Sequence, residues 1–90
     1  MKITDNKLSD SMLSSVKDVI AGAFKYKDSN FERAKYIVER LREIYGDTSY
    51  DFSCIVADNS TCFDAYYNYY HDIYFTCFFE GKFIIIWSGK

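Results

Sequence analysis

The sequence predicts an α+β fold in which two N-terminal helices pack on one face of an antiparallel sheet. Apolar residues recur at three- and four-residue spacing up to Gly46, and after it they form short continuous runs. Turn residues separate these runs, and helices followed by strands are typical of α+β domains. The 90 residues are expected to form a single domain, 1–90, near the size at which one core is only marginally stable.

Two amphipathic helices are predicted before Gly46. Ser9 suits the N-cap of the first, Asn30 can cap the second, and Gly46 can end it. Their apolar stripes comprise Met12, Leu13, Val16, Val19, Ile20, Ala23 and Phe24, and then Phe31, Ala34, Ile37, Val38, Leu41 and Tyr45. The mixed charges on the rest of the second helix indicate a solvated face.

The second half predicts strands joined as an antiparallel meander. The strands are expected at 52–57, 62–66, 72–78 and 82–87, with a short edge strand at 2–4. Within the last strand, the run 83–87 has no polar residue on either face. Because side chains alternate between the faces of a sheet, both faces of this strand must be covered. Two helices cover one face, so the second face is expected to need a partner chain.

The composition and the distribution of charge disfavour nucleic acid and membranes as binding partners. Residues 1–46 carry a net charge of +2 and residues 47–90 a net charge of −4, so the strand half is a poor surface for nucleic acid. No apolar run is long enough to span a bilayer, and the first residues lack the apolar core of a secretion signal. The protein is therefore expected to be soluble and intracellular, without binding membranes or nucleic acid.

Catalytic and metal signals are weak. Cys54, Cys62 and Cys77 are best interpreted as buried, reduced thiols, and with His71 their spacing fits no standard zinc site. We therefore expect no enzyme activity, catalytic residue, metal or cofactor. The aromatic segment 66–72 has two interpretations: a connection whose Tyr rings pack on their neighbours, or an interaction surface.

Several short motifs, taken together, resemble the eight-kilodalton dynein light chain family. The matching pieces are Leu8-Ser9 with Met12, Ser53-Cys54-Ile55-Val56 followed by Asn59, His71-Asp72-Ile73-Tyr74-Phe75, and the closing Ser88-Gly89. The likeness extends from Ile3 to Gly89. It implies a dimer in which two sheets pack face to face and each protomer lends one strand, here about 62–66, to the other.

The resemblance also implies that short extended peptides bind by strand addition beside the exchanged strand, in a groove flanked by the second helix. The groove residues carried over are Cys62, Phe63, Asp64, Ala65, Tyr66, Ile73, Tyr74, Asn30 and Phe31. Those carried over to the dimer interface are Ser53, Phe63, Ile85 and Trp87.

Departures from the family pattern suggest a specialised paralogue. Ser53 replaces a histidine that can make dimerisation sensitive to acid, Ala65 replaces a threonine of the groove, and Asp64 adds a carboxylate. The resulting hypothesis is a non-catalytic light-chain subunit of a dynein motor, either cytoplasmic or in the axoneme of a cilium, that binds an intermediate chain. It would act in the cytoplasm and cytoskeleton, as a homodimer or with a related light chain. The alternative is a motor-independent dimerisation hub for disordered partner proteins.

Overall fold

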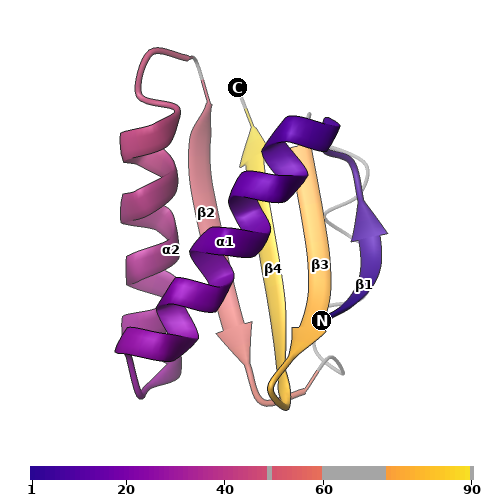
Figure 1. Ribbon diagram of the computed structural model, residues 1–90, viewed down its shortest axis with the longest axis vertical. Coiled ribbons are helices and arrows are strands. Elements are labelled where there is room, and N and C mark those ends of the chain that lie inside the picture. The colour runs from indigo at the N-terminus through magenta and orange to yellow at the C-terminus, as the bar shows by residue number, and fades with distance from the viewer. Residues whose placement is uncertain (49, 60–72, 90) are drawn as a thin grey trace.

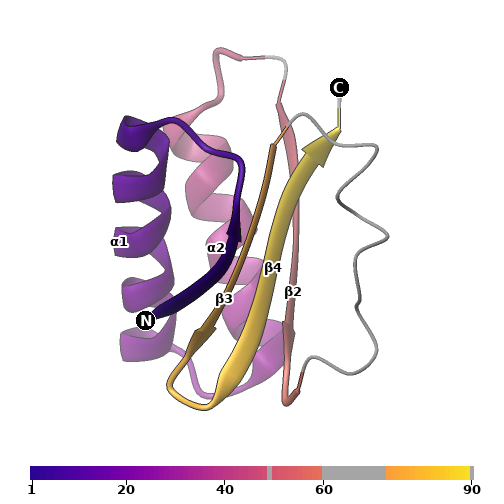
Figure 2. The same ribbon diagram turned by 90° about the vertical axis from the view of Figure 1, so that its right-hand side faces the viewer.

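The computed structural model describes residues 1–48, 50–59 and 73–89, which form two helices packed on a four-stranded antiparallel sheet. The elements in chain order are β1 (Lys2–Asn6), α1 (Asp10–Tyr26), α2 (Asn30–Ile44), β2 (Asp51–Ala57), β3 (Ile73–Phe79) and β4 (Lys82–Gly89). Both helices lie on the same face of the sheet (Figure 1 and Figure 2). The predicted α+β class is confirmed, whereas the predicted strand 62–66 lies outside the described residues.

Serine side chains begin both helices. The Ser9 hydroxyl accepts a hydrogen bond from the backbone N–H of Met12 at 3.3 Å, as the sequence predicts. At α2 the predicted cap Asn30 is wrong, because Ser29 has the extended backbone of an N-cap and accepts from the N–H of Glu32 at 3.1 Å. Asn30 is instead the first helical residue, which leaves its side-chain amide available for a contact with the sheet.

The sheet order is β1-β3-β4-β2, so the predicted meander is wrong in one respect: β4 pairs with β2 as well as with β3, whereas a meander pairs it with β3 alone. The reason lies in the composition of β4. A strand that is apolar on both faces is most stable in the interior of a sheet, with a neighbouring strand on each side. β4 takes that position, and β1 and β2 become the two edges (Figure 1).

A tight turn joins β3 to β4. Glu80 and Gly81 have φ angles of 48° and 79°, so both central residues of this two-residue connection are left-handed. Such a turn matches the right-handed twist of the strands it joins, and glycine adopts it without a steric penalty. The hairpin sets Phe78 opposite Phe83, with ring centroids 4.9 Å apart.

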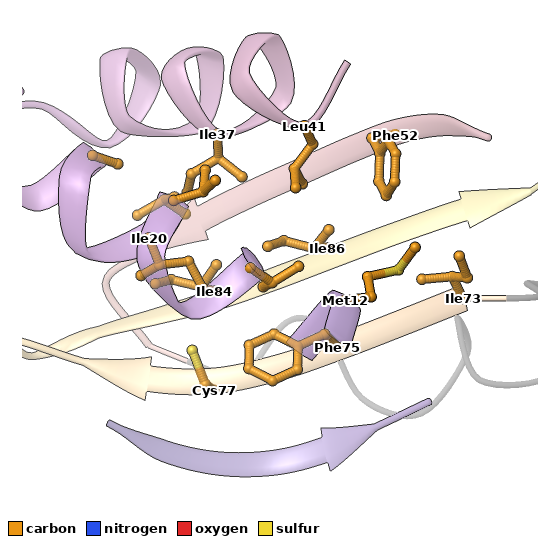
Figure 3. Packing of buried hydrophobic residues seen from close by; sticks show 14 of the residues in the cluster. Met12, Ile20, Ile37, Leu41, Phe52, Ile73, Phe75, Cys77, Ile84 and Ile86 are labelled. Atoms are coloured by element: carbon orange, nitrogen blue, oxygen red, sulfur yellow. The ribbon is translucent and has the colours of Figure 1, made fainter. Parts of the chain in front are cut away.

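The core lies between the helices and the sheet (Figure 3). Ile20 of α1, Ile37 and Leu41 of α2, and Phe75 and Ile86 of the sheet are all fully buried there. Ser88 is also fully buried, and its hydroxyl accepts a hydrogen bond of 2.9 Å from the backbone N–H of Asp51. This bond satisfies the hydroxyl and fixes the start of β2 to the end of β4.

Candidate functional site

The sheet face that points away from the helices carries three of the predicted dimer-interface residues. Ser53 pairs with Trp87 across β2 and β4, and Ile55 pairs with Ile85 on the same side. Of the two alternate faces of β4, Ile84 and Ile86 belong to the core, and Ile85 and Trp87 lie on the outer face. The fourth predicted interface residue, Phe63, is outside the described residues.

The residues of this outer face differ in exposure. Ile85 and Phe83 are only 1% and 6% exposed. Ser53, Ile55 and Trp87 are half-buried. A second chain packing on this face would therefore bury additional surface mainly around β2.

β2 forms one edge of the sheet in the described part of the chain, and the interior of this strand is uncharged. Among the described strands, β2 has one neighbour, β4, and pairs with it without a break in register from Asp51 to Ala57. The residues inside the strand, 52–56, include no charge, glycine or proline. Charges, prolines and bulges are the usual devices that keep an edge strand from pairing with another chain. β2 has none of them in its interior.

Helix α2 runs beside this edge in the opposite direction (Figure 1). Arg42, near the end of α2, lies 3.3 Å from the carboxylate of Asp51 at the start of β2. At the other end, the Asn30 amide donates to the carboxylate of Asp58, just past β2, at 3.1 Å. The β2 edge and α2 are thus linked at both ends, and the predicted groove residues Asn30 and Phe31 lie at one of these ends.

The other predicted groove residues lie elsewhere. Ile73 is 5% exposed and belongs to the core, and Tyr74 is half-buried opposite Trp87. Both are in β3, which β4 separates from β2. A single chain therefore does not bring Ile73 and Tyr74 beside Asn30. The remaining groove residues, 62–66, are outside the described part of the chain.

Asp58 joins three elements, and sequence reasoning missed it. Its carboxylate accepts from the Lys82 ammonium at 2.6 Å as well as from Asn30. The hydrogen bond from Lys82, supported by that from Asn30, lowers the pKa of this carboxyl below its ordinary value. The pairing of Ala57 with Phe83 brings Asp58 to Lys82, so the register of β2 against β4 was the missing signal.

The two described cysteines have protonated thiols at neutral pH. Burial, with a smaller contribution from Cys77, raises the pKa of Cys54 well above its ordinary value, and burial raises the pKa of Cys77 to about 11. Thiol nucleophiles need the opposite shift. Within residues 1–48, 50–59 and 73–89, no three His, Cys, Asp or Glu side chains are grouped so as to hold a metal, and no helix is long and apolar enough to cross a membrane.

Comparison of the chain with models of known protein families gave no match, and comparison with curated proteins gave none either.

Proposed function

We propose that this protein is a dimeric, non-catalytic light chain that binds extended segments of partner proteins by strand addition. One observation carries the proposal: among the described strands, β2 is a sheet edge with no charge, proline or bulge in its interior, and α2 runs beside it. An open edge offers a row of unpaired backbone N–H and C=O groups to an incoming strand. A neighbouring helix adds side-chain contacts that select the strand.

In the proposed dimer, each protomer lends segment 62–66 to the β2 edge of the other, and the bound peptide adds beside the lent strand. The half-buried residues Ser53, Ile55 and Trp87 then face the partner's sheet. This arrangement comes from the resemblance to dynein light chains. The open edge and the shared outer face of these residues support it.

The same resemblance names the partner. We propose an intermediate chain of a dynein motor, in the cytoplasm or in an axoneme, with a homodimer or a related light chain completing the assembly. Purification of the native protein from cells without any dynein subunit would contradict this assignment.

Hydrogen exchange tests strand addition residue by residue. In an antiparallel pair, alternate residues of β2 direct their N–H groups to β4, and the others direct them to the open edge. We expect those other amides to be protected in a dimer measured at high micromolar concentration and to exchange faster on dilution. Sedimentation over the same range gives the mass. A monomer at all concentrations, with no change in β2 exchange, would overturn the proposed dimer.

A further inference from the structure

One face of α2 carries side chains that the described part of the fold leaves largely unused, apart from the ion pair between Arg42 and Asp51. Phe31, Lys35, Val38 and Arg42 follow one another at four, three and four residues, which places them within an arc of roughly 60° on the helix. We call these four residues the α2 stripe. Phe31 is 72% exposed and Val38 half-buried, and within the described chain neither belongs to the core nor packs against it.

Contacts between α2 and α1 fix the direction of the α2 stripe. Arg33 lies over the ring of Phe24 in α1 at 4.2 Å, and the Tyr36 ring lies 6.4 Å from that of Tyr26. At 100° per residue, Arg33 is roughly 160° around the helix from both Phe31 and Lys35, and Tyr36 is roughly 140° from Phe31. The stripe therefore points away from α1, toward the side where the sheet ends at β2 (Figure 1).

Contacts at both ends of the α2 stripe support this direction. Arg42 forms its ion pair with Asp51 of β2, and Phe31 follows Asn30, which is hydrogen-bonded to Asp58 just beyond β2. The stripe thus lies along the open edge of β2. It is the part of α2 that an added strand would meet.

The stripe combines apolar side chains with positive charge. Within the described residues Lys35 forms no ion pair, although Glu39 follows it by one turn, and none of the four stripe residues is acidic. The glutamates of α2 lie on the neighbouring solvent side of the helix. A ligand that satisfies this surface supplies a carboxylate to Lys35 and an apolar side chain to Phe31 and Val38.

We propose that the α2 stripe selects the added strand, and that the preferred partner is an extended segment in which acidic and apolar side chains face α2. This inference rests on the proposed function and adds the chemistry of the partner to it. Lys35 and Phe31 are the two specificity-determining residues.

The test uses a phage-displayed library of random peptides, selected separately on the full 90-residue chain and on its Lys35→Glu variant. Lys17→Glu, an exposed lysine of α1 on the other side of α2, is the control with the same change in charge. We expect the wild type and the control to select Asp and Glu. We expect Lys35→Glu to select Lys and Arg in their place, a reversal that unfolding cannot produce.

Binding affinities of the variants then measure how much each side chain contributes to peptide binding. For the best wild-type peptide, fluorescence anisotropy should show roughly tenfold weaker binding to Lys35→Glu, because an attraction becomes a repulsion, and unchanged binding to Lys17→Glu. Phe31→Ala should also weaken binding roughly tenfold by loss of apolar contact, whereas Tyr26→Ala, which removes another exposed aromatic ring, should not.

The outcomes separate this inference from the proposed function. Peptides without acidic residues, bound equally by wild type and Lys35→Glu, would overturn the inference and leave strand addition standing. A Lys35→Glu variant with unchanged peptide selection but a weaker dimer in sedimentation would show that the stripe contacts a second copy, which also overturns it. Selection of no peptide by any of the chains would overturn both proposals.

Discussion

The two edges of the sheet are built differently. β1 is five residues long, every one of its residues is exposed, and its pairing with β3 shifts register between Ile3 and Asp5. β2 is seven residues long, pairs with β4 in unbroken register, and buries Phe52 and Val56 in the core. Both strands lie at the border of the same sheet (Figure 1). Only β2 is held by the core along its length.

This difference indicates which edge can accept another chain. The irregular pairing and the charges of Lys2 and Asp5 make β1 a poor template for an added strand. β2 presents a straight, uncharged interior beside a helix that can supply selective contacts. A regular edge strand without such protection promotes aggregation unless a strand of a partner covers it.

The largest expected difference between the two edges is in how far a substitution there lowers the free energy of unfolding. Phe52→Ala removes a side chain that is 1% exposed and contacts the rings of Tyr45 and Tyr50, with centroids 5.7 and 6.0 Å away. We expect the free energy of unfolding in urea to fall by about 3–5 kcal/mol. Ile3→Ala, in the more exposed β1, should cost about 1 kcal/mol or less. Equal losses would mean that β1 is anchored as firmly as β2.

Loss of a side-chain hydrogen bond should lower the free energy of unfolding more at β2 than at β1, by smaller amounts than the loss of Phe52. Ser88→Ala leaves the N–H of Asp51 without its acceptor at the start of β2, and the loss should be about 1–3 kcal/mol in urea unfolding. The matched hydroxyl pair on the β1 side is Thr4 with Thr76, whose oxygens are 2.6 Å apart. Thr4→Val should cost about 1 kcal/mol, since β1 is more exposed to water. A larger loss for Thr4→Val would reverse the order of the two edges.

A charge placed on each edge tests which one associates. Ile55→Lys puts an ammonium on the half-buried outer face of β2, and we expect the dimer dissociation constant measured by sedimentation to rise about tenfold or more. Ile3→Lys makes the same change on β1 and should leave the dimer unaffected. If Ile3→Lys alone dissociates the dimer, the association surface has been placed at the wrong edge.

We expect acid to lower the stability of the fold only slightly, through the carboxyl of Asp58 just past β2. The pKa of Asp58 is lower in the folded chain than in the unfolded one, so its stabilising contribution is present above the ordinary carboxyl range, near pH ~4, and is lost as the pH falls through and below it. Urea midpoints at a series of pH values should fall less steeply for Asp58→Asn than for wild type. Asp51→Asn, at the other end of β2, provides the comparison.

Much of the fold followed from local patterns. The stripe of α1 is buried or half-buried as predicted, and each described strand lies within two residues of its predicted bounds at either end. Phe31 belongs to the predicted apolar stripe of the second helix, but it is 72% exposed and does not pack on the core. Helical spacing alone cannot distinguish a core position from one at the margin of the stripe.

The candidate site was harder to predict, because it depends on which strands are neighbours. Strand patterns place side chains on a face but do not say that β4 separates β2 from β3. For this reason strand patterns could not find Asp58 or show that Ile73 lies apart from Asn30 in the single chain, and Asn30 and Phe31 entered the predicted groove through the family resemblance alone.

The pairing of β1 has a consequence for the order in which the fold forms. Lys2 pairs with Phe78, and Thr4 contacts Thr76, 72 residues away, so β1 has the most distant partner among the described strands. The helices and the β3–β4 hairpin depend on near neighbours and can form early, whereas contacts between distant residues form slowly. We therefore expect β1 to dock last, after the strand that it joins has formed.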